Sequence, residues 1–431
     1  MSAELSSEPQ TKATLAGLGF AGHELSRASL DACVKCTICE TQCPVSAVTP
    51  LFTGPKFVGP QAERFRNGES VDHSLDYCSS CGTCTLVCPQ GVQIAELNSQ
   101  ARAVMKAEHM PIRDRLIGQT VLMGKVMTPV APLARAVLNN KPLRKVMQAV
   151  VGVHADAPMP PAQSQSFEGW FNKRPKPDGP FPRGAVVFFH GCAGNYFEVE
   201  TSKKSVEVLE HLGYEVLVPK HGCCGLAQQS NGLFDSATKS VLKLCDDLRS
   251  AGPSSGSGTG LPIVSASGSC TGMLKHEAHE IMGVEDERLH DVGVRTRDIM
   301  EFLLDLYDAG ELPTDFAPIE MTVPYHAPCQ LKSQGMGKPA LEVLKLIPGL
   351  TVVDSNKTCC GIAGTYGLKK EKYEVAQAVG KPLFDMVKET NPDLALCDTE
   401  TCRWQIEQSS GVRTEHPIAM IHAAYGLSTS V

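Results

Sequence analysis

Eight cysteines within the first 88 residues constrain this chain more than any other feature of its sequence. The spacing C-x₂-C-x₂-C-x₃-C-P occurs twice, first from Cys33 to Pro44 and again from Cys78 to Pro89. Three cysteines on one tight loop can reach three irons of a cubane cluster, and the fourth points away and ligates a second cluster. The spacing therefore predicts two [4Fe–4S] clusters, one held by Cys33, Cys36, Cys39 and Cys88, and the other by Cys78, Cys81, Cys84 and Cys43.

We call Cys33–Cys43 the first ladder and Cys78–Cys88 the second ladder. A pair of zinc sites is the alternative, because four close thiolates also suit tetrahedral zinc; the doubled pattern with trailing prolines favours clusters. The flanks 24–34 and 93–108 are rich in helix formers. We therefore expect a helical ferredoxin domain over residues 1–110. Two neighbouring clusters without an evident substrate pocket are typical of electron transfer.

The cysteine usage indicates a reducing compartment. The chain has 18 cysteines among 431 residues, most of them in tight clusters, and its start lacks the basic and apolar regions of a secretory signal. No run of about 18 apolar residues is present, so we expect no membrane-spanning helix. The formal net charge of −7 gives no reason to expect nucleic-acid binding.

Residues 111–183 form a connecting region whose first part is basic. Residues 112–153 contain seven Lys or Arg residues and one Asp, a net charge of +6. Prolines divide the stretch into short helices. Such helices can lie in a membrane interface with anionic lipid, or their apolar stripes can pack on the protein's own domains; both interpretations stay open. Residues 155–183 look like a linker. The apolar residues at helical spacing are Ile112, Leu116, Met123 and Met127, then Leu143, Met147 and Val151.

The rest of the chain is a duplication, with copies predicted at residues 184–310 and 311–431. Four landmarks occur twice in one order, and the two histidines that open the copies are 136 residues apart. The landmarks are His190 to Cys192 with His326 to Cys329, Cys223-Cys224-Gly225 with Cys359-Cys360-Gly361, Cys270 with Cys402, and 294–297 with 412–415.

Each cysteine landmark follows a short β-like run, and helical stretches such as 199–211, 235–249 and 371–389 lie between them. Alternating strands and helices predict a mainly parallel sheet in each copy, with the cysteines gathered at the carboxyl ends of its strands. The fold class is thus α+β and multidomain: an α-helical ferredoxin domain followed by a duplicated α/β cysteine-rich domain. The expected thiolate sets are Cys192, Cys223, Cys224 and Cys270 in the first copy, and Cys329, Cys359, Cys360 and Cys402 in the second.

What these sets bind stays open. Adjacent cysteines can both contact one multinuclear cluster, and the glycine after each pair relieves backbone crowding. A mononuclear zinc ion and inert buried thiols are the alternatives for either copy. His190 and His326 are either ligands or, as we favour, hydrogen-bond partners or structural groups behind the sulfurs. Cys245 and Cys397 fall outside the repeat and are expected to be ordinary buried cysteines.

The paired ladders followed by two CCG repeats resemble the cysteine-rich iron–sulfur subunits found beside flavin dehydrogenases and heterodisulfide reductases. Within that group, four segments are most similar to the C subunits of anaerobic glycerol-3-phosphate dehydrogenases, and the resemblance covers nearly the whole chain. The segments are CVKCTICETQCPV, PLFTGPKFVGPQAERFR, LMGKVMTPVAPL and CRWQIEQSSG.

The resemblance implies a non-catalytic subunit that accepts electrons from a flavin-bearing dehydrogenase subunit, assembles with a second subunit and passes electrons to membrane quinone. It also implies that the basic segment holds the complex peripherally on the cytoplasmic face of the inner membrane. Glycerol 3-phosphate would be oxidised on the partner's flavin. This chain has no Gly-rich dinucleotide fingerprint between a strand and a helix, so it offers no flavin site of its own.

One departure from the family pattern bears on the repeats. The fullest CCG pattern, as in the catalytic subunit of heterodisulfide reductase, closes with C-x₂-C, but here the first of those cysteines is Ser267 or Thr399. A noncubane cluster that needs five thiolates is therefore in doubt, and so is catalytic disulfide reduction. A third interpretation is an iron–sulfur subunit that serves a glycolate or lactate oxidase.

Overall fold

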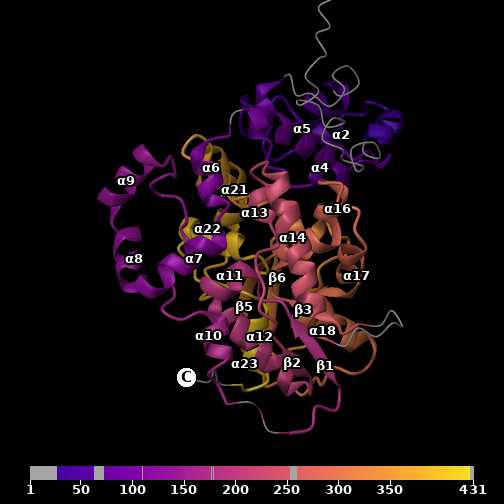
Figure 1. Cartoon of the computed structure of the whole chain (residues 1–431), viewed down its shortest axis with the longest axis vertical. Helices are drawn as coiled ribbons and strands as arrows, with labels where there is room; N and C mark the ends of the chain where they lie inside the picture. Colours follow the sequence, from indigo (N-terminus) through magenta and orange to yellow (C-terminus); the bar gives the residue numbers. More distant parts are fainter. Residues whose placement is uncertain are drawn as a thin grey trace, which may run out of the picture.

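The computed structural model describes residues 27–62, 72–108, 110–175, 177, 179–252 and 260–427. The helical domain with the two ladders lies at one end of the molecule (top of Figure 1), and the two copies of the repeat form the rest of its body. Each copy contains one four-stranded, all-parallel sheet. This is the architecture that the cysteine landmarks predict.

The amino-terminal domain is built around one long helix, α5 (Ile94–Glu108), which confirms the predicted helical flank at 93–108. Leu97 of α5 packs in the small core around the first ladder, and Ala101 packs in the core around the second. The flank predicted at 24–34 falls partly outside the described residues, and its described part is a single short turn. The short elements are η3 (Ser29–Ala32), α2 (Ile38–Thr41), η4 (Phe57–Gln61), η5 (His73–Tyr77) and α4 (Thr83–Leu86).

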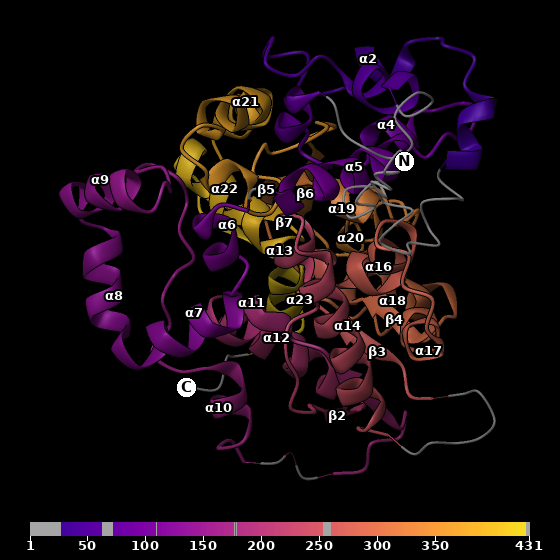
Figure 2. The ribbon, with the colours of Figure 1, turned by 45° about the horizontal axis from the view of Figure 1, so that its top comes forward.

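Residues 112–150 form a segment that we call the arm. Figure 2 shows α8 and α9 at the outer edge of the molecule, with α7 and α8 meeting at a corner. Pro129 and Pro132 lie at this corner, where a proline removes a helical hydrogen bond and bends the chain. After the arm, the chain returns along the body to α10 (Phe167–Phe171). The arm consists of α6 (Ile112–Ile117), α7 (Thr120–Met127), η6 (Thr128–Val130), α8 (Ala131–Leu138) and α9 (Lys141–Val150).

The arm contains one apolar stretch of membrane-spanning length that was not expected from the sequence. Thr120–Leu138 is long and apolar enough, by length and composition, to cross a membrane, with a mean hydropathy of 1.4 and only 11% of its 18-residue window buried. Counting uninterrupted apolar residues missed it because Lys125 and Arg135 interrupt the run. The corner divides this stretch into α7 and α8, each of 8 residues. Eight helical residues span about 12 Å, far less than a bilayer core.

The first copy has strand order β2-β1-β3-β4, and the second has the equivalent order β6-β5-β7-β8. The last landmark pair, 294–297 and 412–415, overlaps β4 and β8, so all four landmarks occupy matching places. The first copy contains β1 (Ala185–Phe188), α11 (Gly191–Tyr196), α12 (Val199–His211), β2 (Glu215–Leu217), α13 (Leu226–Gln229), α14 (Phe234–Arg249), β3 (Ile263–Ser265), α15 (Gly268–Gly272), η7 (Met273–Glu277), α16 (Ala278–Glu280), α17 (Glu287–Arg295), β4 (Thr296–Asp298) and α18 (Ile299–Asp308).

The second copy is shorter between its strands. It contains β5 (Met321–His326), α19 (Cys329–Lys332), α20 (Pro339–Leu344), β6 (Leu350–Asp354), η8 (Tyr366–Leu368), α21 (Tyr373–Glu389), β7 (Ala395–Cys397), α22 (Glu400–Ser410), β8 (Thr414–Glu415) and α23 (Ile418–Ala424).

The two copies share one hydrophobic core. Phe188 of β1 and Tyr325 of β5 are fully buried in the same cluster of side chains. Helix α12 of the first copy packs on α23 of the second, and α18 packs on α20. Burial of this shared apolar surface holds the two sheets in a fixed relation, so their carboxyl ends, which carry the cysteines, have defined positions relative to each other.

Candidate functional site

The two ladders form loops of the same shape. In the first, Lys35 and Thr37 have positive φ angles of 60° and 68°; in the second, the matching residues Ser80 and Gly82 have φ angles of 53° and 77°. Left-handed backbone at non-glycine residues is uncommon and is held in place by surrounding structure. Each loop then enters one helical turn, α2 or α4. The repeated geometry indicates that both loops turn around an object of the same kind.

The structure brings Cys33, Cys39 and Cys88 together in one small core, to which Cys84 also belongs. Burial and the neighbouring Glu40 raise the pKa of Cys39 to about 11, and Cys88 and Cys33 add to this rise. Cys36 lies on the same loop and is exposed. The fourth cysteine of the second ladder therefore lies with the first ladder.

Cys43, the fourth cysteine of the first ladder, lies with the second ladder. It shares a core with Cys78 and lies close enough to Cys81 for that thiol to raise its pKa. Burial raises the pKa of Cys84, and Cys78, Cys81 and Cys43 raise it further. Thiols buried in this way stay protonated unless a metal binds their thiolates. Two groups of four thiols on matching loops fit two [4Fe–4S] clusters.

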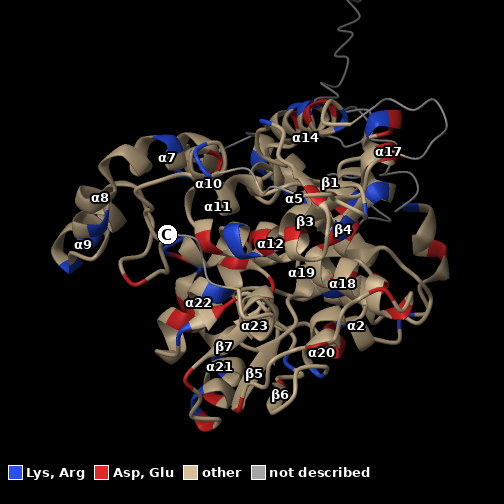
Figure 3. Ribbon diagram, turned by 90° about the horizontal axis from the view of Figure 1, so that it is seen from below, with Lys and Arg blue, Asp and Glu red and all other residues tan. Residues whose placement is uncertain are grey.

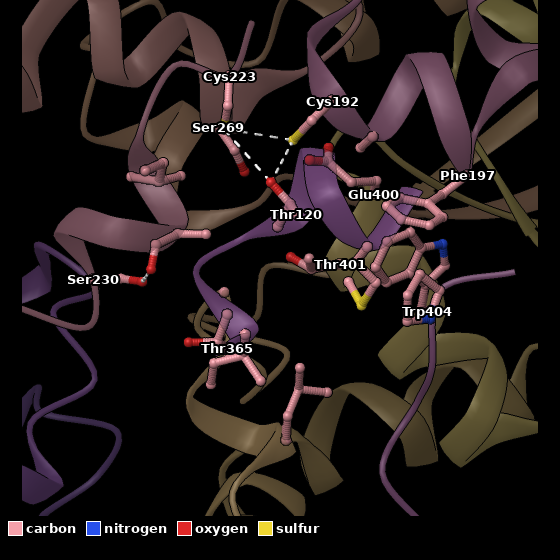
Figure 4. A pocket seen from close by; sticks show the side chains of 18 of the residues that line it. Thr120, Cys192, Phe197, Cys223, Ser230, Ser269, Thr365, Glu400, Thr401 and Trp404 are labelled. Atoms are coloured by element: carbon pink, nitrogen blue, oxygen red, sulfur yellow. Dashed lines mark hydrogen bonds between the residues drawn. The ribbon is translucent and has the colours of Figure 1, made fainter. Parts of the chain in front are cut away.

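In the first copy, the predicted thiols meet at the carboxyl ends of the strands. Cys192 follows β1, Cys223 and Cys224 follow β2, and Cys270 follows β3. The sulfurs of Cys192 and Cys223 are 3.7 Å apart, and those of Cys224 and Cys270 are 3.4 Å apart. Thr120 of α7, which the sequence did not mark, lies 3.1 Å from Cys192 Sγ through its Oγ1 (Figure 4). No local pattern could have found Thr120, because only folding brings the arm to this edge.

Hydrogen bonds between the sulfurs shift the pKa values of these thiols in opposite directions. Those with Cys192 and Cys224 hold the pKa of Cys223 well below its ordinary value. The same bonds, together with burial, raise the pKa values of Cys192 and Cys224. One thiolate is thus favoured among protonated neighbours, an arrangement that can begin the binding of a metal group.

The second copy gathers the equivalent set in a more buried place. The sulfurs of Cys360 and Cys402 are 3.0 Å apart, and Cys329 and Cys359 are hydrogen-bonding neighbours. Burial alone would raise the pKa of Cys360, but hydrogen bonds with Cys359 and Cys402 lower it to about 6. Within the described ranges, no three His, Cys, Asp or Glu side chains form a group that could hold a metal ion in their present positions.

Cys397 contacts the second thiol set, although the sequence predicted an ordinary buried cysteine. It ends β7, is fully buried, and forms a hydrogen bond with Cys402 through its thiol. Sequence reasoning set it aside because it has no counterpart in the first copy. Cys245, in contrast, is buried in α14 with its pKa raised to about 12, mainly by burial.

The glycine after each cysteine pair is required by close packing. Gly225 and Gly361 have φ angles of +89° and +88°. A Cβ at Gly225 would lie 2.8 Å from the carbonyl oxygen of Ala237 in α14, and one at Gly361 would lie 1.9 Å from that of Ala376 in α21. A long helix thus presses directly on each cysteine pair and holds it at the sheet edge.

The two residues in place of the missing cysteines have different environments. Ser267 caps α15 and also donates a hydrogen bond to Glu400 of the second copy, at 3.2 Å. Thr399 is buried, and its Oγ1 has no hydrogen-bond partner among the described residues. A buried hydroxyl without a partner beside four thiols fits a site that holds a further group.

The two histidines lie behind the sulfurs and bond elsewhere. His190 Nδ1 contacts the carbonyl oxygen of Gly191 at 2.7 Å, and its ring stacks on His221 with centroids 3.9 Å apart. His326 Nδ1 lies 3.1 Å from Ser355 Oγ, and burial lowers the pKa of His326 to about 3. The Nε2 atoms of both rings are buried and have no hydrogen-bond partner among the described residues, so the structural role of these histidines stays a prediction.

Each thiol set borders a different cavity, and the two cavities have different neighbours. The inner cavity, of about 50 Å³, is bordered by the second set and by Cys81 of the second ladder. The outer cavity, of about 130 Å³, is bordered by the first set and by Thr120 and Met123 of the arm. Ser230, Ser269 and Thr401 line both cavities. The duplicated sets are therefore not equivalent: the second faces the ladders, and the first faces the arm.

Comparison with known families matches this division of the chain. Residues 29–92 match the family model described as a 4Fe-4S dicluster domain, and residues 186–275 and 323–407 each match that of the cysteine-rich domain. These matches confirm the predicted fold class and show that the chain is of an iron–sulfur type.

The chain is also similar to characterised proteins along most of its length. It is 36% identical over 401 residues to the C subunit of the anaerobic glycerol-3-phosphate dehydrogenase of Escherichia coli (strain K12), covering 92% of this chain and 98% of that protein. It is 23% identical to the D subunit of a heterodisulfide reductase of Methanosarcina barkeri, over 93% and 95% of the two chains. It is 27% identical to lactate utilization protein A of Oceanobacillus iheyensis, over 48% and 82%.

Proposed function

The chain belongs to the family of C subunits of anaerobic glycerol-3-phosphate dehydrogenases, and from this premise we propose that it passes electrons from a flavin-bearing catalytic subunit to membrane quinone. Its relatives are subunits of oxidoreductase complexes, so catalytic partner subunits are expected. Glycerol 3-phosphate would be oxidised on the partner's flavin, and a second partner subunit would complete the complex. Docking would occur on the cytoplasmic face of the inner membrane.

In this proposal Cys33, Cys36, Cys39 and Cys88 hold one [4Fe–4S] cluster, and Cys43, Cys78, Cys81 and Cys84 hold the other. When bound, these clusters supply one-electron transfer. The eight thiols of the repeats hold further iron–sulfur centres or zinc.

The observation that carries the proposal is the order of the sites. The ladders border the second thiol set through Cys81, the two cavities share lining residues, and the first thiol set borders the arm through Thr120. The chain therefore offers a continuous series of sites from its amino-terminal domain to its most exposed apolar segment.

The arm supports membrane docking because its apolar side chains are left uncovered. Val150 is 80% exposed and Ile112 is 77% exposed, and eight further large apolar side chains along the arm are also exposed. Exposed apolar stripes of this length mark a binding surface. The eight are Leu116, Leu122, Val126, Val130, Leu133, Val137, Leu143 and Val146.

The structure also sorts the basic residues of the arm. Arg144 is buried and donates hydrogen bonds to the carbonyl oxygens of Leu138, His154 and Ala157. Arg113 is paired with Asp114 and Glu371. The exposed basic residues available to anionic lipid are Arg115, Lys125, Lys141 and Lys145, whereas the exposed Arg135 donates a hydrogen bond from Nε to the carbonyl oxygen of Ala162. Figure 3 shows the blue of Lys and Arg on α7 and α9, with most of the arm apolar or uncharged.

We expect the intact chain to bind vesicles that contain phosphatidylglycerol, and Lys141→Glu with Lys145→Glu to weaken this binding at least about tenfold, since each basic residue near such a surface contributes about 1 kcal/mol. Sedimentation with vesicles measures the effect. The matched control reverses the same charge on exposed residues away from the arm, Lys239→Glu with Lys388→Glu.

Equal loss of binding in the two double variants would show that only the net charge of the chain matters, and unchanged binding in the arm variant would show that the arm is not the docking surface.

The electron-transfer part of the proposal has its own test. Chemically reduced chain should be reoxidised by a soluble naphthoquinone, followed through the visible absorbance of its clusters; no reoxidation would contradict the quinone assignment.

A second candidate keeps the electron-transfer role and changes the partner. The similarity to lactate utilization protein A favours a flavoprotein that oxidises a 2-hydroxy acid. Co-purification of the chain with its flavoprotein decides between the two. A partner that oxidises glycerol 3-phosphate supports the first assignment, and one that oxidises lactate or glycolate supports the second.

A further inference from the structure

The outer cavity has walls that suit a neutral, apolar ligand with an aromatic ring. Trp404 and Phe197 form one side, with ring centroids 6.2 Å apart in an edge-to-face arrangement (Figure 4). Ile117, Met123 and Leu226 line other parts of it. Its volume of about 130 Å³ is close to that of an apolar protein cavity that holds a single benzene ring.

The charge of the cavity wall excludes anionic ligands. Among the described residues that line it there is no Lys, Arg or His, and Glu400 is its one acidic residue. A phosphate, carboxylate or sulfonate would enter without a counter-ion, which is strongly unfavourable in a buried place. Glycerol 3-phosphate and 2-hydroxy acids are therefore unsuitable occupants, and the ligand is uncharged.

The cavity lies between a redox-type site and the lipid-facing arm. Its floor includes Cys192 and Cys223, and one wall is α7, whose other side exposes Leu122 and Val126. Helix α7 ends at the corner with the exposed α8. The cavity therefore lies next to the helix that leads to the exposed apolar part of the arm.

One polar group in the cavity is oriented by its neighbours. The carbonyl oxygen of Ala227, which can only accept, takes a hydrogen bond from Asn231 Nδ2 at 2.7 Å and so fixes the direction of that amide, and Lys369 Nζ bonds to Asn231 Oδ1 at 2.8 Å. The amide nitrogen of Asn231 then donates to Thr365 Oγ1 at 2.9 Å. Because Thr365 accepts this bond, its own hydrogen is left to donate into the cavity that it lines. Asn231 and Lys369 are both buried, so the orientation is rigid.

From these features we propose that the outer cavity binds the headgroup of a membrane quinone on the side lined by Trp404 and Thr365, next to the metal centre that the four thiols would hold, with Thr365 donating a hydrogen bond to one quinone carbonyl oxygen. This inference rests on the proposed function and adds the site and its residues. Reduction of the quinone to the quinol consumes two electrons, supplied through the chain by the reduced flavin of the partner, and two protons from solvent. Thr365 is a specificity residue, because it binds the acceptor without exchanging electrons.

The test is equilibrium binding of 2-heptyl-4-hydroxyquinoline N-oxide, a redox-inert quinone analogue whose fluorescence reports binding, to the intact chain purified without oxygen. Thr365→Val removes the donor and keeps the shape, and we expect it to weaken binding about tenfold. Ala227→Phe places a ring inside the cavity that Ala227 lines, and we expect it to abolish binding.

The matched controls lie outside the cavity and should bind like the unmodified chain. Thr390→Val removes a hydroxyl that bonds only to a carbonyl at the end of α21, and Ala423→Phe adds a ring on an exposed face of α23. Iron content and circular dichroism show whether each variant is folded and loaded. If Ala227→Phe fails to fold, Thr365→Val carries the test alone.

The possible failures are distinguishable. Binding that neither Thr365→Val nor Ala227→Phe changes would overturn the cavity assignment and leave the quinone function standing. No binding by the unmodified chain, together with no reoxidation by naphthoquinone, would overturn both. Loss of binding in the cavity variants with unchanged vesicle binding supports the assignment and separates it from docking.

Discussion

Cys43 and Cys88 each close their own ladder in the sequence, yet each lies among the cysteines of the other ladder. Cys88 is close to Cys39, and Cys43 is close to Cys78 and Cys81. A single ladder cannot supply four thiolates to one cube because its fourth cysteine follows three residues later and points away. The exchange ties the two loops together, so the loss of one cluster would also loosen the loop around the other.

This pairing of cysteines predicts which variants alter the same electron paramagnetic resonance signal. Cys43→Ser should alter the same electron paramagnetic resonance signal as Cys78→Ser, and Cys88→Ser should alter the same signal as Cys33→Ser. Each should lower the cluster iron by about four atoms per chain, since one cubane is lost. Cys245→Ser, a buried cysteine remote from the ladders, is the control that leaves both signals in place. A signal shared by Cys43→Ser and Cys33→Ser would reverse the pairing.

At the scale of elements, α7 is held to the body through one glycine. A Cβ at Gly124 would lie 2.3 Å from Cγ of Tyr196 in α11. The ring of Tyr196 therefore rests directly on the α7 backbone, which keeps Thr120 beside the first thiol set. The same contact explains why Met123 and Met127, which the spacing placed on one apolar stripe, are half-buried, while Leu122 and Val126 are exposed.

Gly124→Ala should loosen α7 from α11, because overpacking of this kind costs about 1–3 kcal/mol. We expect amide hydrogen exchange in α7 to become about tenfold faster or more, with exchange in α14 unchanged. Gly118→Ala is the matched control, since its added Cβ would meet its nearest neighbour at 3.4 Å. Equal exchange rates in the two variants would show that the Tyr196 contact does not hold the arm.

At the scale of the whole molecule, a buried ion cluster joins three parts of the chain. Asp114 of the arm is fully buried and accepts hydrogen bonds from Lys106 of α5 at 2.8 Å and from Lys369 of the second copy at 2.7 Å. Burial alone would raise the pKa of Asp114, but Lys369 and Lys106 outweigh it and hold this pKa well below its ordinary value. The cluster thus fixes the ladders, the arm and the repeats relative to one another.

Asp114→Asn should lower the melting temperature at pH 7, because it removes the buried carboxylate that accepts hydrogen bonds from Lys106 and Lys369, and breaking a buried pair of this kind costs about 3–5 kcal/mol. A carboxyl with a lowered pKa stabilises the fold above its unfolded value, 3.8, and this contribution is lost as the pH falls below that value. The difference between variant and unmodified chain should therefore shrink below about pH 4.

Asp247→Asn is the control, since Asp247 pairs with Lys243 on the surface of α14, where an ion pair contributes little. Melting followed by circular dichroism between pH 3 and pH 8 measures both variants. If the difference stayed constant across this range, the stabilisation would not come from the charge of Asp114.

Much of this organisation could be predicted from local patterns. Ligand spacing in the ladders is set by short loops, and the duplicated landmarks follow strands whose ends must meet at one edge of a parallel sheet. Helix α12 begins and ends at the predicted residues, 199–211. The basic character of the arm was also evident from the sequence. Which of its charges are free to meet a membrane surface was not, because Arg113 and Arg144 bond inside the molecule. Periodicity cannot distinguish these two residues from Lys141 or Lys145.

The sequence by itself determined the family, the two ladders and the two thiol sets, because each depends on residues close in the chain or at equivalent places in a repeat. Only the tertiary structure decided that the sets differ, with Cys81 beside one and Thr120 beside the other. It also brought Thr365, Asn231 and Lys369 into one chain of hydrogen bonds. Such contacts join residues far apart in the chain, 72 positions for Thr120 and Cys192 and 138 for Asn231 and Lys369. They arise from packing of whole elements, which local spacing does not encode.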